Sequence, residues 1–355
     1  MPLEEELDRF KAKFDRQLEI FLIDKINQHR QVDPVLADMT KRVAKRVLRG
    51  GKRIRPLLIK LAYDLAGGKD SEKIIKAGIA IELLHQYLLT HDDIIDRDQI
   101  RYGGDTLEVD YHKLFQKKFN KTDPHLGLSL GIIAGDHLHT LALDALTESG
   151  FPAESIIKAV NWLNQILYDT VAGFQITYFQ NHLPIAKAEE TDYLKGILLV
   201  SGRYTIEAPL MLGLILADNT SIKSALHHYS QNVGLGFQMQ DDILGLFGNT
   251  KTTGKPVGND IREGKKTLLL VKTYKRVNSE EKKFLQKCVG KNITQIRLRQ
   301  IRHLVKKSGT LKECQNLAKD YVKKGKSALS TLKITPSQAT TLLTDIADFL
   351  ITRSK

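Results

Sequence analysis

Apolar side chains recur at intervals of three and four residues along most of the chain. Residues 10–21 and 81–88 show this spacing most clearly, with Phe, Leu and Ile along one stripe. Such spacing places the apolar groups on a single face of an α-helix. Sustained alternation of apolar and polar positions, which is typical of strands, is hard to find. The pattern therefore predicts a chain that is nearly all α.

Prolines divide this pattern into separate helical stretches, because a proline breaks the interior of a helix. The clearest breaks are at Pro34, Pro56, Pro124, Pro152 and Pro184. Roughly ten or more helices are expected from these breaks. No long linker rich in Gly, Ser or Pro and no repeat is evident, which favours one domain over residues 1–355. Polar loops that contain glycine cover residues 97–105 and 248–266.

The composition is typical of a globular protein in a reducing compartment. Hydrophobic residues make up 42% of the 355 residues and charged residues 27%, which suits a folded soluble chain. Cys288 and Cys314 are the only cysteines, which excludes a disulfide framework and a cysteine-rich zinc site. The acidic N-terminus is unlike a signal peptide, and the apolar runs are shorter than the about 18 residues that span a bilayer. We therefore expect a cytoplasmic location.

Positive charge is concentrated in the last third of the chain. Lys and Arg exceed Asp and Glu by 54 to 41 overall, but residues 251–355 alone hold 25 against 8. Basic runs of this kind most often form solvated helix faces. Peripheral contact with an anionic membrane surface is an alternative. Nucleic acid is not an expected partner, because neither aromatic interleaving nor a nucleic-acid-binding motif accompanies the basic runs.

An acidic cluster lies at residues 91–96, which are His-Asp-Asp-Ile-Ile-Asp. On a helix, Asp92, Asp93 and Asp96 fall three or four residues apart and share a face, where their charges repel. Carboxylates in this arrangement suit Mg²⁺, which completes its shell with water and phosphate oxygens. An acidic helix end in solvent is the alternative. The apolar run at residues 83–89 favours instead a place beside an interior cavity.

A second acidic pair, Asp241 and Asp242, begins 149 residues after Asp92. Two acidic helices that face each other can hold one polyphosphate through shared metal ions, whereas a single helix would hold it poorly. Residues 50–56 and 253–267 add glycines and cations that suit phosphate oxygens, and the second segment is typical of a lid. Taken singly, each basic segment is equally consistent with an ordinary turn.

Taken together and in this order, the motifs resemble those of the trans-polyprenyl diphosphate synthases. The resemblance covers about residues 45–270 and leaves a basic helical part at 271–355. It rests on Gly-Gly-Lys-Arg-Ile-Arg-Pro at 50–56, Asp-Asp-Ile-Ile-Asp at 92–96, Gly-Asp at 135–136, Phe-Gln-Met-Gln-Asp-Asp at 237–242 and Gly-Lys-Lys-Thr at 264–267. It implies an all-α, single-domain bundle around a central cavity, usually a homodimer. The implied reaction joins isopentenyl diphosphate to dimethylallyl, geranyl or farnesyl diphosphate, with three Mg²⁺ ions per site.

The resemblance also implies roles for individual residues. The implied Mg²⁺ ligands are Asp92, Asp93, Asp96, Asp241 and Asp242. The implied contacts to the allylic diphosphate are Arg101, Lys255 and Lys265, and those to isopentenyl diphosphate are Gly51, Lys52, Arg55 and His85. Gln238 and Ser201 would face the carbocation with their oxygen atoms. The family needs no enzyme nucleophile, and the departing diphosphate is expected to remove the final proton.

Several positions depart from the family pattern. Gly245 stands where the second acidic motif usually has a third Asp, and Tyr102 replaces the second Arg after the first motif. Val200 replaces a Lys that normally contacts the allylic diphosphate, and Phe174 interrupts a Gly-Gln pair. Each lost charge-assisted contact is worth about 1.5–3 kcal/mol. The alternative interpretation is therefore a weakened prenyl-diphosphate-binding or regulatory subunit of a heteromeric synthase.

The expected product length follows from the residues that precede the first acidic motif. Tyr87 lies five residues before Asp92, and Leu88 lies four before it. The growing chain is expected to extend along this helix, where each residue adds about 1.5 Å of depth. An aromatic residue at the fifth position resembles the floor of synthases that stop at C20, although Tyr87 could simply pack in the core. All-trans geranylgeranyl diphosphate is therefore the expected product, and residues 201–210 resemble archaeal members, where such a product would feed membrane lipid synthesis.

Overall fold

Helices make up nearly all of the chain that the structure describes. The computed structural model describes residues 3–120, 122–248, 257–332 and 337–352. Within those ranges the only sheet is an antiparallel ladder of two short strands, β1 (Ile100–Arg101) and β2 (Gly104–Asp105). The prediction of an all-α fold is confirmed.

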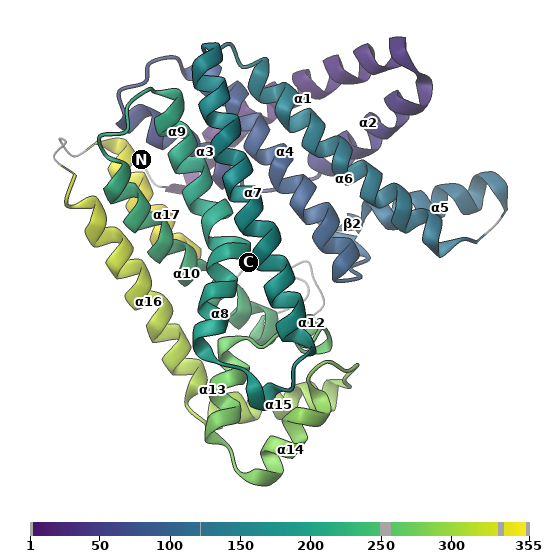
Figure 1. Cartoon of the computed structure of the whole chain (residues 1–355), viewed down its shortest axis with the longest axis vertical. Helices are drawn as coiled ribbons and strands as arrows, with labels where there is room; N and C mark the ends of the chain where they lie inside the picture. Colours follow the sequence, from purple (N-terminus) through teal and green to yellow (C-terminus); the bar gives the residue numbers. More distant parts are fainter. Residues whose placement is uncertain (1–2, 121, 249–256, 333–336, 353–355) are drawn as a thin grey trace. The chain divides into compact units, whose positions relative to one another are not determined.

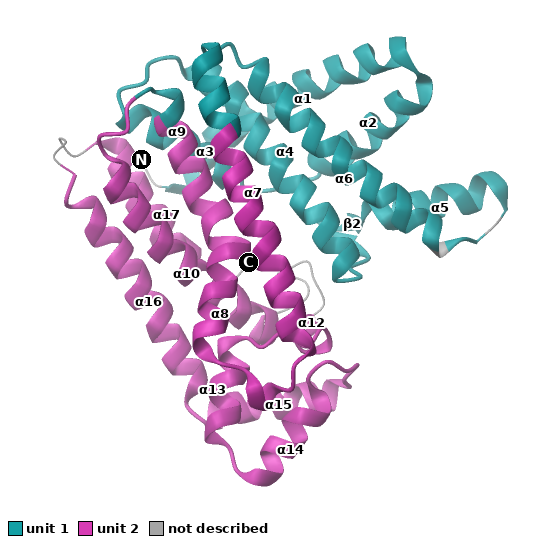
Figure 2. Cartoon of the chain, viewed as in Figure 1, with its two compact units in different colours: residues 1–160, 215–218 teal, residues 161–214, 219–355 magenta. Residues whose placement is uncertain are grey.

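The chain forms two compact units, which Figure 2 colours separately. Unit 1 comprises residues 1–160 and 215–218, and unit 2 comprises residues 161–214 and 219–355. Each unit is described by itself below. The expectation of a single domain over residues 1–355 stays a prediction.

Unit 1 is built around one buried helix, α4 (Figure 1). Its helices are α1 (Leu3–Val32), α2 (Pro34–Val47), α3 (Ile54–Leu65), α4 (Ser71–Ile95), α5 (Leu107–Phe119) and α6 (Pro124–Thr147). Asp70 starts α4 by accepting hydrogen bonds from the backbone N–H groups of Glu72 and Lys73. Residues 77–86 are all buried, because α4 packs along α6 and also contacts α1 and α3. This packing fixes the end of α4, where the first acidic motif lies.

Unit 2 contains most of the remaining helices. They are α7 (Ala153–His182, which begins in unit 1), the 3₁₀ turn η1 (Ile185–Lys187), α8 (Glu190–Ile197), the π-helical segment η2 (Leu198–Glu207), α9 (Ala208–Leu216), α10 (Lys223–Phe247), α12 (Asn259–Arg262), α13 (Leu268–Arg276), α14 (Ser279–Cys288), α15 (Gln295–Lys307), α16 (Thr310–Leu329) and α17 (Gln338–Thr352). The long helix α10 packs along both α16 and η2. It carries the second acidic motif near its C-terminal end.

A pair of glycines lets η2 and α10 touch backbone to backbone. A Cβ atom built on Gly234 would lie 2.8 Å from the Cα atom of Gly202, which is too close for any other residue. The same contact holds η2, with Ser201, against the helix that carries Gln238 and Asp241. Short π-helical segments occur often at functional sites, which fits this position.

Both cysteines lie in the core of unit 2. Cys288 and Cys314 are each 1% exposed and pack with Leu285, Ile301 and Leu304. Burial raises the pKa of both thiols, that of Cys314 to about 12. Both are free thiols, in keeping with the expectation that they form no disulfide framework.

Two helical segments of the described chain are long and apolar enough to cross a membrane by length and composition alone. They are His125–Thr147 and Glu190–Leu216. Of the most apolar stretch in each segment, 39% and 67%, respectively, is buried. Apolar helices in the core of a soluble protein meet the same criteria. The two segments are therefore weak evidence for a membrane span.

Candidate active site

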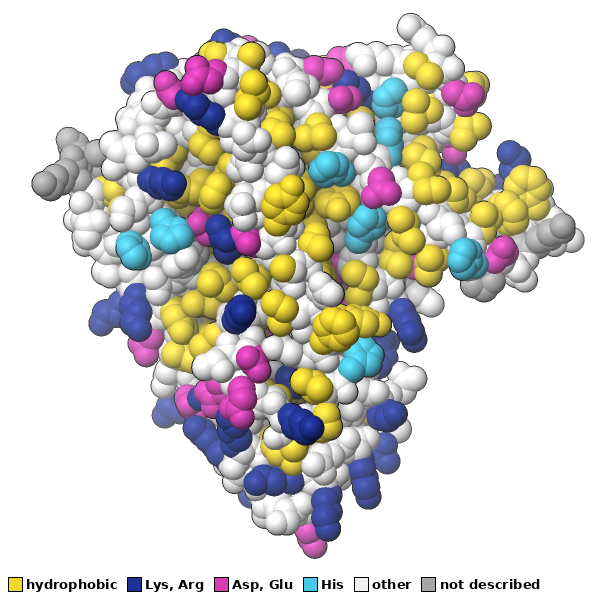
Figure 3. All heavy atoms as spheres, in the orientation of Figure 1, with side chains coloured by type: hydrophobic (Ala, Val, Ile, Leu, Met, Phe, Trp, Pro, Cys, Tyr) yellow, Lys and Arg dark blue, Asp and Glu magenta, His cyan; other side chains and the backbone are white. Residues whose placement is uncertain are grey.

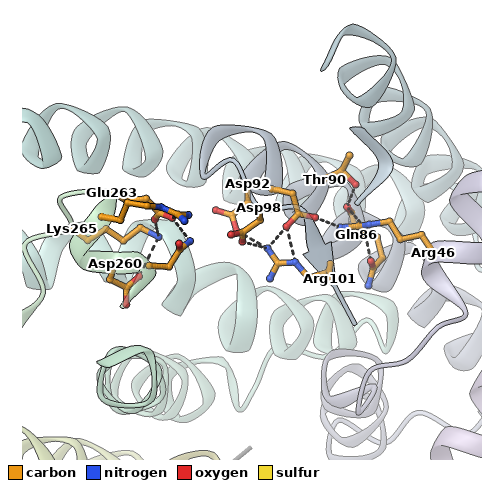
Figure 4. Close-up of polar contacts among 12 residues, drawn as sticks. Arg46, Gln86, Thr90, Asp92, Asp98, Arg101, Asp260, Glu263 and Lys265 are labelled. Atoms are coloured by element: carbon orange, nitrogen blue, oxygen red, sulfur yellow. Dashed lines mark hydrogen bonds and ion pairs between the residues drawn. The ribbon is translucent and has the colours of Figure 1, made fainter. Parts of the chain in front are cut away.

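Carboxylates gather where α4 ends in unit 1 (Figure 4). Asp92 and Asp93 occupy its last turn, Asp96 caps its C-terminus, and Asp98 follows in the loop. Arg101, on β1, folds back onto this group: its Nε donates to Asp93 Oδ1 at 2.7 Å, and its Nη2 lies 3.3 Å from Asp92 and 3.5 Å from Asp98. The negative end of the helix dipole points at the same place. The cluster therefore attracts cations.

Arg101 remains charged at any physiological pH. Burial by itself would lower the pKa of its guanidinium, but Asp93, Asp92 and Asp98 more than offset this and raise the pKa. Arg101 lies beside the first acidic motif, as expected from the sequence, whereas Asp98 was not predicted. The polar loop after the motif was the only signal that could have found it.

The second carboxylate of the motif is held from two sides. Asp93 is 1% exposed, and its Oδ2 accepts from Arg46 Nη2 at 2.7 Å while its Oδ1 accepts from Arg101. Arg46 comes from α2, is also 1% exposed, and donates from Nη1 to Gln86 Oε1 at 2.8 Å. Nothing in the sequence pattern pointed to Arg46, because its partners are 40 and 47 residues away.

The basic segment at 50–56 is anchored by one buried arginine. Arg53 has a left-handed backbone (φ 54°) and donates to Asp15 at 2.7 Å, Glu82 at 2.6 Å and the carbonyl oxygen of Val47 at 2.8 Å. It thereby ties the loop between α2 and α3 to α1 and α4. Gly51, at φ 119°, supplies the turn that its neighbour requires. Arg53 is structural, which leaves Lys52 and Arg55 as the candidates for phosphate contact.

A neutral histidine lies near these arginines. His85 is buried on α4, and burial, followed by the charges of Arg55, Arg101 and Arg46, holds the pKa of its imidazole well below its usual range. The structure thus brings His85 and Arg55, two of the predicted isopentenyl diphosphate contacts, into one electrostatic neighbourhood with Arg101. A neutral imidazole there can donate one hydrogen bond without adding charge.

Three other positions from the sequence analysis, Tyr87, Leu88 and Tyr102, lie in unit 1. The ring of Tyr87 lies 4.8 Å from that of His91 and 5.2 Å from that of His139, and Leu88 is buried. Tyr102, which stands where the family has an arginine, hydrogen-bonds with the side chain of Gln86. Burial, followed by Glu82, raises the pKa of Tyr102, so it is a neutral phenol.

The second acidic motif lies in unit 2, and its second aspartate is also engaged. Asp242 accepts from the Tyr193 hydroxyl at 2.8 Å and from Gln238 Nε2 at 3.1 Å. Burial, followed by the charge of Asp260, raises the pKa of Asp242 to about 7. Burial and the neighbouring negative charge both disfavour the ionised form of Asp242, which a bound cation would stabilise.

Asp260, from α12, fills the place of a carboxylate that the motif lacks. A Cβ atom built on Gly245 would lie only 2.4 Å from Asp260 Oδ2. The absent third Asp at position 245 is thus matched by an Asp brought in from another segment. Asp260 was not predicted from the sequence, although a glycine at 245 combined with an Asp in the polar loop 248–266 was a usable signal.

The segment after α12 positions a predicted cation beside Asp260. Lys265 Nζ lies 3.6 Å from Asp260 Oδ1 and 2.8 Å from Glu263 Oε2 (Figure 4). Lys266 donates to the carbonyl oxygen of Asn181, which fastens this segment to the end of α7. Lys255, the other predicted cation of the lid, lies outside the described residues.

The substituted positions in η2 are tightly packed. A Cβ atom on Gly173 would lie 2.9 Å from Val200 Cγ2, so Val200 fills the space beside α7. Ser201 follows on the π-helical segment, in a half-buried position. Phe174 follows Gly173 on α7. The larger cationic side chain expected at position 200 is replaced by an apolar contact.

Comparison with known proteins identifies the family of the chain. The family model described as polyprenyl synthetase matches residues 37–305. The geranylgeranyl diphosphate synthase of Sulfolobus acidocaldarius is 36% identical over 312 residues, which cover 86% of this chain and 88% of that protein. The geranylfarnesyl diphosphate synthase of Aeropyrum pernix is 31% identical, with 86% and 91% covered.

Solved structures show the same fold. The geranylgeranyl pyrophosphate synthase of Corynebacterium glutamicum, in complex with isoprenyl diphosphate and magnesium, superposes with a TM-score of 0.88 at 28% identity, covering 96% of this chain and 98% of that one. The synthetase of Pyrococcus horikoshii gives 0.82 at 29% identity, covering 99% of both. The chain therefore belongs to the polyprenyl synthetase family of trans-prenyltransferases and has the all-α isoprenoid synthase fold.

Proposed function

We propose that this chain joins isopentenyl diphosphate to dimethylallyl, geranyl or farnesyl diphosphate and ends at all-trans geranylgeranyl diphosphate, in the cytoplasm. The observation that carries the proposal is the carboxylate cluster at the end of α4 with Arg101 folded onto it. The names of the relatives support the reaction and the C20 product.

The donor sets of both motifs fit Mg²⁺. Both offer carboxylate oxygens, which this hard cation prefers. The first set lies at the negative end of α4, and the second includes Asp242, whose pKa is raised. We propose three ions per site, with Asp92 and Asp96 in unit 1 and Asp241 and Asp242 in unit 2 as direct ligands and Asp260 in support. Asp93, the remaining ligand that the resemblance implies, is engaged by Arg46 and Arg101. When bound, Mg²⁺ would neutralise the diphosphate that leaves.

The chain's own residues then bind and orient the two substrates. Arg101 and Lys265 offer donors to the allylic diphosphate, and Lys52, Arg55 and neutral His85 do so for isopentenyl diphosphate. The allylic C–O bond breaks and its electron pair leaves with the diphosphate. The isopentenyl double bond forms the new C–C bond, and the departing diphosphate accepts the released proton. Gln238 and Ser201 would direct oxygen atoms at the intermediate cation.

The test is incubation of the purified chain with labelled isopentenyl diphosphate and each allylic diphosphate, with Mg²⁺ or with EDTA, followed by product sizing. A Mg²⁺-dependent C20 product supports the proposal. Absence of product from a folded chain would contradict it. The relatives do not favour the alternative of a weakened regulatory subunit, and turnover by the chain alone would remove that alternative.

Replacing Tyr87 with Ala should lengthen the product beyond C20. The aromatic ring is the large side chain one turn before the acidic motif, and its removal leaves room for further prenyl units along α4. The measurement is product sizing with farnesyl diphosphate as primer. Phe119→Ala, at an exposed position on α5, is the matched control and should leave the product unchanged. An unaltered product from Tyr87→Ala would refute the floor assignment.

We also propose that the chain forms a homodimer through α7. Aromatic and aliphatic side chains are exposed along this helix, with Tyr168 at 69% and Phe179 at 65%, and apolar side chains line its course in the space-filling view (Figure 3). Light scattering should give twice the chain mass. Phe179→Asp should give the monomer mass, whereas Val35→Asp, at an exposed position of α2, should not change it. A monomeric unmodified chain would contradict the assignment.

Peripheral contact with an anionic membrane is a further proposal, supported by the surface of α14 and α15. Lys and Arg gather over this part of unit 2 (Figure 3), and Ile296 is 62% exposed among them. The chain should sediment with vesicles that contain phosphatidylglycerol and be released by salt. Arg297→Glu with Arg299→Glu should weaken sedimentation, whereas Lys117→Glu with Lys118→Glu, on α5, should not. Equal sedimentation with neutral vesicles would contradict the proposal.

A further inference from the structure

One arginine beneath the first acidic motif belongs to no role assigned so far. Arg46 lies in α2, and its guanidinium is fully buried. It bonds to Asp93 Oδ2 at 2.7 Å, to Gln86 Oε1 at 2.8 Å and to the carbonyl oxygen of Gln86 at 3.2 Å (Figure 4). Burying a guanidinium is unfavourable unless partners of this kind compensate for the lost water.

A second set of contacts fixes the partner of Arg46. Thr90 Oγ1 donates to the carbonyl oxygen of Gln86 at 2.7 Å, and Gln86 Nε2 lies 3.3 Å from Glu82 Oε1. Gln86 also hydrogen-bonds with Tyr102. The amide oxygen of Gln86 is therefore held toward Arg46, and Arg46 is held toward Asp93. The arrangement is built from α2, α4 and the loop that follows.

The charges of this arrangement matter for phosphate binding. Asp93 shares one negative charge between two guanidinium groups, so Arg46, Asp93 and Arg101 together carry a net charge of plus one. If Arg46 were absent, the full charge of Asp93 would fall on Arg101. Asp92 and Asp98 also lie near Arg101, at longer distances, and offset part of its positive charge. The positive potential that Arg101 can offer a substrate therefore depends on Arg46 neutralising part of the charge of Asp93.

We propose that Arg46 is a positioning residue for diphosphate binding: it takes one oxygen of Asp93, which keeps Asp93 out of the metal shell and keeps Arg101 electropositive and aimed at the substrate. Asp93 then acts as a bridge between two arginines rather than as a ligand. The inference rests on the proposed function. It adds a residue that lies outside the sequence motifs on which that function is based.

The test compares the unmodified chain with four variants, and with Asp92→Asn as a reference, for affinity toward inorganic diphosphate, with Mg²⁺, by calorimetry. Arg46→Met should weaken binding about tenfold, the effect of one charge-assisted contact. Asp93→Asn should lose less affinity than Asp92→Asn, because Asn can still accept from Arg101. The double variant should recover most of the affinity and the unfolding temperature that Arg46→Met loses. Arg42→Met, one turn earlier on α2 and paired with Asp38 and Asp110, is the control and should bind normally.

The outcomes separate this inference from the function on which it rests. Turnover assays should show a higher KM for the allylic diphosphate in Arg46→Met, with a smaller change in kcat. Binding by Arg46→Met equal to that of the unmodified chain, or a double variant no better than Arg46→Met, would overturn the inference. So would an Asp93→Asn chain as impaired as Asp92→Asn, because Asp93 would then be a ligand. No diphosphate binding by the unmodified chain would instead refute the proposed function.

Discussion

Replacing Asp92 with Asn should lower kcat/KM about a hundredfold or more, comparable to removing one strong transition-state contact. The carboxylate lies in the last turn of α4, at the negative end of the helix, and faces Arg101 at 3.3 Å. An amide keeps the shape but loses the charge that binds Mg²⁺, so the leaving diphosphate would be less well neutralised. Steady-state rates measured over a range of Mg²⁺ concentrations would test this, and added Mg²⁺ should restore part of the rate.

The matched control is Asp110→Asn on α5. That carboxylate pairs with Arg42 at 2.6 Å, outside the cluster, and its loss should leave kcat/KM close to that of the unmodified chain. Unfolding curves of both variants would show that neither effect reflects misfolding. If Asp92→Asn retained nearly normal rates at low Mg²⁺, the ligand assignment would be wrong.

Replacing Arg53 with Met should destabilise unit 1 by about 3–5 kcal/mol, the range for breaking a buried ion pair from one side. Arg53 is 2% exposed and donates hydrogen bonds to Asp15, Glu82 and the carbonyl oxygen of Val47. Its loss would leave the Glu82 carboxylate buried without this partner. Urea unfolding followed by circular dichroism measures the change in the free energy of unfolding.

An exposed ion pair gives the comparison for Arg53. Lys60→Met removes the partner of Asp64 one turn along α3, and such surface pairs are worth about 0.5 kcal/mol or less. Arg53 lies beside Lys52 and close to Arg55 in sequence, so affinity for isopentenyl diphosphate should fall as well. A variant as stable as Lys60→Met would show that the loop does not depend on its buried arginine.

Helical periodicity and the order of the motifs were sufficient to predict the fold class and the family. Both signals are local. An apolar stripe at intervals of three and four residues can be recognised within one helix, and an acidic motif can be recognised within five residues. The network beneath the motif was not predictable in this way. Arg46 meets Asp93 only after α2 and α4 pack together, and a basic residue before a glycine pair has no pattern that reveals burial.

The second motif shows a different limit of sequence reasoning. Gly245 stands where the family motif usually has a third Asp, and the structure places the Asp260 carboxylate against it. The carboxylate comes from α12 and the glycine from α10, and only the fold shows that these two helices meet. The role expected for Lys255 stays a prediction, since that residue lies outside the described residues. The sequence pattern thus predicted the two acidic motifs but not every group that packs against them.

The two buried cysteines offer a built-in reporter of how the protein opens. Both lie in the core of unit 2, and residues 1–160 contain no cysteine at all. Alkylating reagents attack the thiolate, which burial and the raised pKa suppress in the native protein. Maleimide labelling would therefore record transient opening of unit 2 alone. Combined with a probe of total helicity, it would show whether the two units unfold together or in turn, without any engineered label.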